Sequence, residues 1–186
     1  MATTRRLTIA EGDYGTEQTV AVMAGLIRDG ALLPSVRAVA VDVVTNLDSS
    51  DPLSQLWALR AWLAGHFQFV RDPASGELLH DADNLMRQVA AQGIAKGDCD
   101  DAAIFAGALA CAVGFRVALV TVAVGDSRPA PFLSQLPYGH VWASASPLEA
   151  IRDESGRQVW IEFDVTRPMQ SIPLNRIARS AATLVC

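Results

Sequence analysis

The stretch GDCDDAAIFAGALACAV, residues 97–113, decides the fold of this chain. Asp98 can cap a helix because its carboxylate accepts backbone N–H groups of the first turn, and Asp101 follows three residues later, as in an aspartate version of the capping box. The run 102–113 contains no charged residue, and a helix that is apolar on every side is buried at the centre of a protein. The sequence therefore predicts a central helix with Cys99 as its first residue.

The sequence before this helix predicts further helices. Val20, Met23, Ala24 and Ile27 recur at the spacing of one helix face. A segment after Pro34 shows both helical spacing and strand alternation, and we interpret it as a helix. Two more helix starts are marked by proline or by capping aspartates: Asp51-Pro52, and Asp81 or Asp83.

The sequence after the central helix predicts strands. Segments at 117–124, 140–145 and 158–165 are strand candidates, and a loop over 125–139 with three prolines separates the first two. Helices segregated from neighbouring strands favour an α+β fold with an antiparallel sheet. One domain over residues 1–186 is expected. Its parts are a helical region of about 1–95, the central helix and sheet of about 96–168, and a C-terminal tail of 169–186.

The composition argues against several classes of protein. Of the 186 residues 51% are hydrophobic and the net charge is −5, so we expect a packed core and no nucleic-acid partner, which would need a basic surface. The sequence shows no signal-peptide pattern and no uncharged stretch of about 18 residues, so we expect no membrane partner. Three cysteines without CxxC spacing predict neither a disulfide framework nor a zinc finger. A reducing, cytoplasmic location is expected.

Cys99 is the candidate nucleophile. The thiolate is the reactive form of cysteine, and a helix N-terminus lowers the pKa of a thiol through its partial positive charge. The free N–H groups there could also stabilise an oxyanion. Asp98, Asp100 and Asp101 act in the opposite direction, because like charge disfavours a thiolate. A cationic partner is therefore required, and of the three histidines His140 is the best candidate.

Strand alternation predicts where the partner of this histidine lies. His140 shares a face of its strand with Trp142, and Asp164 shares a face of the next strand with Trp160. If the strands are neighbours, His140 and Asp164 project from one side of the sheet, and we expect the Cys99 helix to pack on that side. Asp164 would then orient the imidazole and stabilise its charged form.

Three motifs around these residues resemble those of the transglutaminase-like superfamily of papain-like thiol enzymes, especially its bacterial and phage members. The matching segments are GDCDDA at 97–102, GHVW at 139–142 and WIEFDVT at 160–166, with further likeness in FVRDP at 69–73 and DNL at 83–85. The resemblance covers roughly residues 55–168. It implies a core of one helix packed on an antiparallel sheet and a triad of Cys99, His140 and Asp164, with no cofactor.

The resemblance also implies a reaction, thiol-dependent acyl transfer from an amide of a peptide or protein substrate. Ala143-Ser144 stands where the family often has an acidic residue, and the chain lacks the extra domains of animal cross-linking enzymes. Both departures favour hydrolysis of a peptide or isopeptide bond over cross-linking. The alternatives are a cross-linking transglutaminase and a non-catalytic scaffold or phage particle-assembly protein, which would be virion-associated. A zinc site built from the same three residues is less favoured, so no metal is expected.

Several further residues receive roles in this interpretation. Gln92, seven residues before Cys99, is a candidate for the oxyanion hole, and Trp142, Tyr138 and Asp98 are candidates for the pocket wall or the active-site loop. The loop 125–139 is long enough for a lid but could equally be a passive connector. The remaining cysteines and histidines are assigned structural or surface positions: Cys111 in the core, Cys186 as a mobile free thiol, and His66 and His80 as surface or hydrogen-bonded groups.

Overall fold

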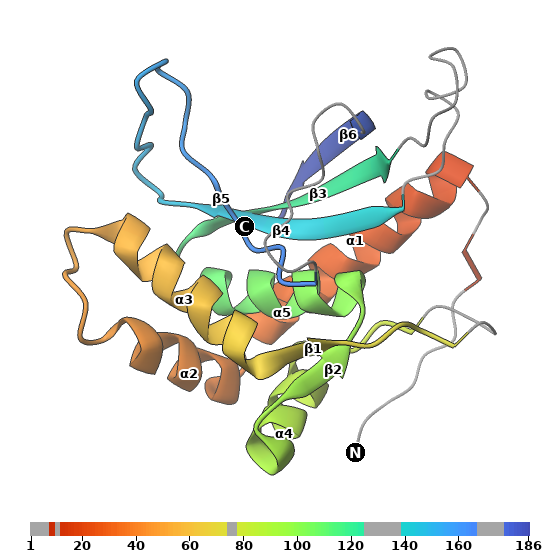
Figure 1. Ribbon diagram of the computed structural model, residues 1–186, viewed down its shortest axis with the longest axis horizontal. Coiled ribbons are helices and arrows are strands. Elements are labelled where there is room, and N and C mark those ends of the chain that lie inside the picture. The colour runs from red at the N-terminus through yellow and green to blue at the C-terminus, as the bar shows by residue number, and fades with distance from the viewer. Residues whose placement is uncertain (1–7, 10–11, 74–77, 125–138, 167–176) are drawn as a thin grey trace.

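The structure is a computed structural model, and it describes residues 8–9, 12–73, 78–124, 139–166 and 177–186. Its central helix, α5, lies between a layer of helices and a sheet (Figure 1). The helices are α1 (Gly12–Ala31), α2 (Pro34–Val44), α3 (Pro52–His66), α4 (Ala82–Gln92) and α5 (Cys99–Ala112). The strands are β1 (Phe67–Phe69), β2 (Ala95–Gly97), β3 (Arg116–Val124), β4 (His140–Ser146), β5 (Ile161–Glu162) and β6 (Ile177–Leu184). The predicted α+β class is confirmed.

Helix α5 is the hydrophobic centre of the protein. All of its residues are buried except Cys99 and Cys111, which are half-buried. The helix packs against α1 to α4 and against β3 and β4. Gly107 allows α1 to come close, because a β-carbon at this position would lie 2.8 Å from Cδ1 of Ile27. The uncharged composition of α5 therefore reflects apolar neighbours on every side, as its sequence predicted.

The main sheet has four antiparallel strands in the order β5-β4-β3-β6. Residues that alternate along β3 and β4, such as Leu119, Val141 and Ala143, belong to the core shared with α5. The intervening Val122 and Trp142 form a separate small cluster, with Val120 packed against it. A second sheet pairs β1 with β2 in parallel and leads directly into α5.

The C-terminal segment differs from the prediction of a tail. Residues 177–184 form β6, which pairs with β3 along the edge of the main sheet. This pairing depends on contacts between segments about 60 residues apart in the chain, for example Thr121 with Ala181, and local sequence pattern carries little information about such contacts. The third predicted strand, at 158–165, is also shorter than expected, since β5 covers only Ile161–Glu162.

The prediction of a free thiol at Cys186 was wrong, while Cys111 packs against the core as expected but in a disulfide that was not foreseen. Cys111 of α5 and Cys186 at the end of the chain form a disulfide, with their Cα atoms 6.4 Å apart. β6 brings residue 186 to α5, because the backbone of Cys186 accepts a hydrogen bond from Val117 N–H at the start of β3 (3.2 Å). Two cysteines 75 residues apart are therefore joined, and Cys99 is left as the free thiol.

No single described helix is long and apolar enough to cross a membrane. Two consecutive helices, α1 from Tyr14 onward and α2, are together long and apolar enough for a membrane span, but they are bent by 74° relative to one another. Both helices contribute side chains to the core around α5, among them Met23, Ile27, Val36 and Ala40.

The disulfide gives a first prediction. Cys186→Ser should lower the free energy of unfolding by about 2–4 kcal/mol, because the bond closes a long loop and restricts the unfolded chain. Urea unfolding of wild type and variant measures this change, and intact mass before and after reduction reports the bond. Reduced wild type should match Cys186→Ser in stability. Equal stability of oxidised wild type and Cys186→Ser would contradict the prediction.

Candidate active site

The first turn of α5 is held by a reciprocal capping box. The Asp98 carboxylate accepts the N–H groups of Asp100 (3.0 Å) and Asp101 (3.5 Å), and the Asp101 carboxylate accepts the N–H of Asp98 (3.4 Å). This confirms the predicted start of the helix at Cys99. The cap fixes the path of the backbone on both sides of Cys99, and therefore the direction in which its side chain leaves the helix.

A glycine precedes the cap because the Asp101 side chain occupies the space beside it. A β-carbon on Gly97 would lie 2.5 Å from the Cβ of Asp101, closer than side-chain carbons approach one another. The same glycine is the last residue of β2, and its carbonyl accepts the N–H of Val70 (2.7 Å). The small parallel sheet and the capping box therefore meet at Gly97.

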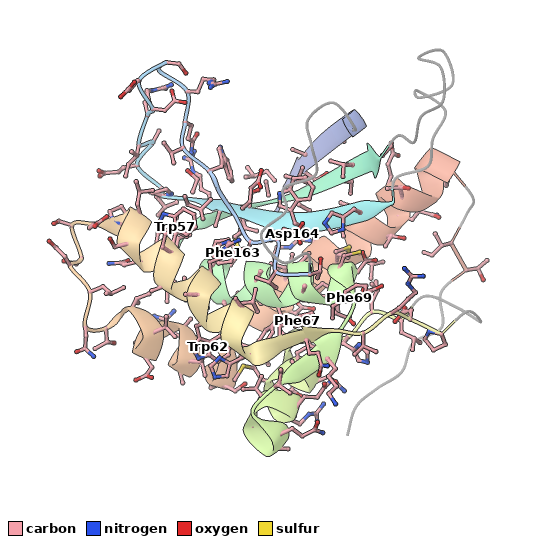
Figure 2. All side chains as sticks on the ribbon, in the orientation of Figure 1. Trp57, Trp62, Phe67, Phe69, Phe163 and Asp164 are labelled. Carbon is pink, nitrogen blue, oxygen red and sulfur yellow. A yellow bond between two sulfur atoms is a disulfide. The ribbon has the colours of Figure 1, made fainter. Side chains whose placement is uncertain are left out.

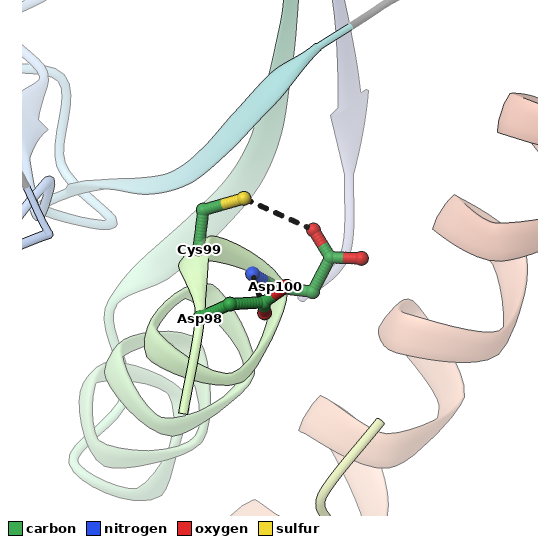
Figure 3. Close-up of side chains that lie close together, drawn as sticks. All are labelled: Asp98, Cys99 and Asp100. Atoms are coloured by element: carbon green, nitrogen blue, oxygen red, sulfur yellow. Dashed lines mark hydrogen bonds between the residues drawn. The ribbon is translucent and has the colours of Figure 1, made fainter. Parts of the chain in front are cut away.

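The Cys99 thiol lies in an acidic, partly buried environment. It donates a hydrogen bond to Oδ1 of Asp100 at 3.5 Å (Figure 3). Burial, and then the charges of Asp100 and Asp98, raise the pKa of the thiol far above its ordinary value, while the N–H of Val141 acts in the opposite direction. In this environment the thiol is neutral, so the lowering of its pKa by the helix end is outweighed.

His140 and Asp164 form a buried pair at the start of β4. Nε2 of His140 lies 2.7 Å from Oδ2 of Asp164, and the imidazole is almost completely buried. The other carboxylate oxygen accepts the N–H (3.2 Å) and the hydroxyl (2.9 Å) of Thr166. Burial alone would raise the pKa of Asp164, but the hydrogen bond and charge of His140, with the Thr166 hydrogen bonds, hold it below its ordinary value.

The segment after β5 carries Asp164 to this position. The N–H of Phe163 donates to the carbonyl of Ala143 on β4 (2.8 Å), and the Phe163 side chain is buried in the core. Figure 2 shows Phe163 and Asp164 in this segment, close to α5 and the main sheet. Asp164 follows the short strand instead of ending a long one, but the backbone bond keeps it against β4. The predicted partnership of His140 and Asp164 is therefore present as a direct contact.

Cys99 lies where α5 packs on β4, next to the residue that follows His140. The N–H of Val141, the residue after His140, is close enough to the Cys99 sulfur to act on its pKa. Val141 belongs to the core shared with α5, whereas Trp142 packs on the opposite face of the sheet. Cys99 thus lies beside the backbone at the beginning of β4, where His140 is.

The expectation that α5 covers the face shared by His140 and Trp142 was wrong. Trp142 packs with Val122 on the other face, with its ring centroid 5.7 Å from that of His140, and its indole N–H donates to the hydroxyl of Ser144 (3.2 Å). The apolar residues Val141, Ala143 and Ala145 face α5 instead, because a buried alanine-rich helix packs best on an apolar surface. His140 is the first residue of β4, and its ring contacts Asp164 and the ring of Trp142.

The remaining predicted site residues have different outcomes. Gln92 is the last residue of α4 and is exposed, and no hydrogen bond joins its side chain to another described residue. Asp98 is the helix cap, as described above. Tyr138 and nearly all of the loop 125–139, apart from Gly139, lie outside the described residues.

The zinc alternative built on Cys99, His140 and Asp164 does not fit the geometry. Three zinc ligands at 2.0–2.3 Å from one ion lie within about 4 Å of one another. Among the described residues, the ligand atoms that lie within 4.8 Å of one another are those of Asp98, Cys99 and Asp100. The Asp98 carboxylate already caps the helix, and Asp100 accepts a hydrogen bond from the thiol. Hydrogen bonding accounts for this cluster.

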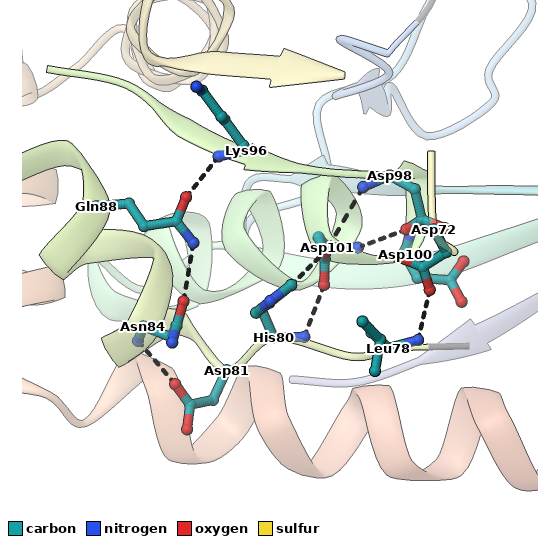
Figure 4. A network of polar contacts seen from close by, with 10 residues as sticks. All are labelled: Asp72, Leu78, His80, Asp81, Asn84, Gln88, Lys96, Asp98, Asp100 and Asp101. Carbon is teal, nitrogen blue, oxygen red and sulfur yellow. Dashed lines mark hydrogen bonds and ion pairs between the residues drawn. The ribbon is translucent and has the colours of Figure 1, made fainter. Parts of the chain in front are cut away.

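One contact of the site was missed by the sequence analysis. His80, which was expected to be on the surface or hydrogen-bonded, contacts the capping residue Asp101 through both its backbone N–H (2.7 Å) and Nδ1 (2.8 Å) (Figure 4). The general expectation of a hydrogen-bonded histidine is confirmed, but its partner was not foreseen. The two residues are 21 positions apart in the chain, and no local pattern links them.

Comparison with known proteins supports the fold. No family model matches the chain, and no curated protein matches it. A Cytophaga hutchinsonii protein called a "putative cysteine protease" superposes with a TM-score of 0.51 and 18% identity, over 80% of this chain and 45% of that one. A Parabacteroides distasonis ATCC 8503 protein called a "putative protease" gives a TM-score of 0.50 and 12% identity, over 77% and 26%.

The chain therefore spans less than half of the length of either solved structure. At 12–18% identity the likeness establishes a shared fold and by itself no activity.

The close packing of Gly97 gives a second prediction. Gly97→Ala should destabilise the protein by about 1–3 kcal/mol, because the added methyl group displaces Asp101 from the cap. Thermal unfolding measures the change. Gly65→Ala is the matched control, since a β-carbon there meets nothing within 4 Å and alanine is the better helix former. Equal stability of Gly97→Ala and Gly65→Ala would contradict this account of the cap.

The lowered pKa of Asp164 gives a third prediction. A carboxylate whose pKa is depressed in the folded protein stabilises it above the unfolded pKa of about 3.9, and this contribution is lost as the pH falls through the folded value. Wild type should therefore be more stable than Asp164→Asn at pH 6, with a difference that shrinks below about pH 4.

Urea unfolding at a series of pH values measures this difference, with the exposed Glu162→Gln as the control. A difference between wild type and Asp164→Asn that is constant down to about pH 2 would contradict the prediction.

Proposed function

We propose that the protein is a thiol-dependent hydrolase of amide bonds, in which Cys99 is the nucleophile, His140 the acid and base, and Asp164 the residue that orients His140. The observation that carries the proposal is the buried His140–Asp164 pair, 2.7 Å apart, at the start of the strand against which the free thiol of Cys99 is packed. A catalytic histidine needs a carboxylate of this kind to select its tautomer and to stabilise its charged form.

In the proposed reaction His140 moves the proton of Cys99. With Nε2–H of His140 donating to Asp164, Nδ1 is left as the basic nitrogen. Because the Cys99 thiol is neutral at rest, Nδ1 removes its proton as the sulfur attacks the amide carbonyl. The S–C bond forms, the carbonyl oxygen becomes an oxyanion, and the positive charge on the imidazole is stabilised by Asp164. Collapse breaks the C–N bond, and His140 returns the proton to the leaving amine.

Water then completes the reaction. His140 removes a proton from the attacking water, the thioester is hydrolysed, and the Cys99 thiol is regenerated. The backbone N–H of Cys99 is available to the oxyanion, because it has no hydrogen-bond acceptor among the described residues while the Asp98 carboxylate takes the next two N–H groups. The capping box thus leaves the first N–H of α5 to the substrate.

The names of the two structural neighbours, "putative cysteine protease" and "putative protease", are in keeping with the same class of reaction. The narrower assignment to the transglutaminase-like superfamily rests on the motifs around Cys99, His140 and Asp164. We propose it on that basis, with a peptide or protein as the substrate. Hydrolysis is preferred to cross-linking because Ala143-Ser144 stands where the family often has an acidic residue.

One observation favours a second candidate, a non-catalytic scaffold with a retained fold. Burial and the carboxylates of Asp100 and Asp98 raise the pKa of the Cys99 thiol, and a thiol in such a setting reacts slowly unless a base assists it. The two candidates therefore differ in whether His140 activates Cys99.

Labelling of Cys99 tests the proposed function. A panel of peptidyl (acyloxy)methyl ketones and cell-wall-derived fragments carrying the same reactive group should label wild type once, at Cys99, as shown by intact mass and peptide mapping. His140→Gln should label more slowly by about two orders of magnitude, because its base is lost, and Cys99→Ala should not label.

Asp164→Asn should fall between wild type and His140→Gln. Trp57→Ala, at a half-exposed position on α3, is the control and should label like wild type. If His140→Gln labels as fast as wild type, Cys99 is not activated by His140, and the scaffold candidate replaces the hydrolase.

A further inference from the structure

The carboxylate of Asp101 is the most deeply buried acidic group of the site. Its side chain is fully buried, and both of its oxygens are occupied. Oδ1 accepts the backbone N–H of His80 (2.7 Å), while Oδ2 contacts Nδ1 of His80 (2.8 Å) and the backbone N–H of Asp98 (3.4 Å). Two of these three partners are backbone N–H donors and the third is a ring nitrogen that donates when protonated, which is the pattern of an ionised carboxylate.

A buried ionised carboxylate requires a compensating charge, because removing it from water costs several kcal/mol. His80 is the partner that supplies it. Its hydrogen bond to Asp101 raises the pKa of His80, burial acts in the opposite direction, and the charges of Asp101, Asp72 and Asp81 raise it further. The groups that face His80 from α5 and from the segments before α4 are thus all acidic.

The pair also joins two parts of the fold. His80 lies between Leu78, whose N–H donates to the carboxylate of Asp72, and Asp81, which caps α4 by accepting the N–H of Asn84 (2.7 Å). Figure 4 shows the resulting network, which continues through Gln88 to the N–H of Lys96 on β2 (2.8 Å). The hydrogen bonds of the residues on either side therefore fix the backbone of His80. A fixed His80 can in turn hold the carboxylate of Asp101 in place.

We propose that His80 is a positioning residue for Cys99, and that its protonated form holds Asp101 in the capping geometry that places the thiol and the N–H of Cys99 for catalysis. This inference rests on the proposed function. His80 contacts neither the thiol nor the His140–Asp164 pair. It acts through Asp101, whose oxygen accepts the N–H of Asp98, the residue whose carboxylate in turn holds the first turn of α5.

The pH dependence follows from the raised pKa of His80. A group whose pKa is raised in the folded protein contributes its full effect below the unfolded value of about 6.5, and loses it as the pH rises through the folded value. The alignment of Cys99 should therefore weaken above about pH 6.5, independently of the protonation of His140.

Two reagents separate alignment from simple thiol reactivity. A peptidyl (acyloxy)methyl ketone that labels wild type needs an aligned thiolate, histidine and oxyanion donor, whereas iodoacetamide needs the thiolate alone. The ratio of the two labelling rates, measured from pH 5.5 to pH 9, therefore reports alignment and cancels the ionisation of the thiol itself. Thermal unfolding of each variant confirms that folded protein is compared.

Three proteins make the test. His80→Ala removes the ring donor and should lower the rate ratio about tenfold or more at pH 6, since small displacements of a reacting group cost up to about two orders of magnitude in rate. His80→Asn keeps a donor near the position of Nδ1 but is always neutral. The rate ratio of His80→Asn should lie between those of His80→Ala and wild type at pH 6 and should not vary with pH. The rate ratio of wild type should fall toward that of His80→Asn as the pH rises.

The proposal would be overturned if His80→Ala had the same rate ratio as wild type at every pH. It would also be overturned if the rate ratio of wild type exceeded that of His80→Asn by a constant factor across the pH series. Either result leaves the proposed function standing if labelling still depends on His140. Failure of wild type to label at Cys99 at all, or labelling independent of His140, instead overturns the proposed function itself.

Discussion

The capping of the first turn of α5 is the interaction on which the rest of the structure depends. The carboxylates of Asp98 and Asp101 exchange hydrogen bonds with the backbone around Cys99, and they end β2 and begin the buried helix within two residues. A helix that is apolar on every side has no freedom to shift along its axis without losing core contacts. Fixing its first turn therefore fixes Cys99 relative to the sheet on which the helix packs.

The capping aspartates make the surroundings of Cys99 acidic. Asp98 and Asp100 raise the pKa of the thiol that they help to place, so a reactive Cys99 must take its base from elsewhere in the fold. The His140–Asp164 pair is a base of the required kind, and it comes from the sheet, not from the helix. Under the proposed function, the packing of α5 on β4 matters for chemistry as well as for stability.

Two carboxylates of the site are each paired with a histidine. Asp101 is matched by His80 and Asp164 by His140, each through a ring nitrogen within 2.8 Å of a carboxylate oxygen. The first pair lies behind the helix start and the second lies at the start of β4. We assign the His140–Asp164 pair to proton transfer and the His80–Asp101 pair to position. The disulfide Cys111–Cys186 ties the far end of α5 to the chain terminus.

The sequence alone determined the elements whose signals are local. The capping box, the uncharged run of α5 and the starts of β3 and β4 were predicted correctly, because caps and periodicity depend on neighbouring residues. Tertiary structure decided what depends on distant ones: the strand β6, the disulfide, the face of the sheet that α5 covers, and the partner of His80. These contacts join residues 21 to 75 positions apart, and only the packing of the whole chain brings such residues together.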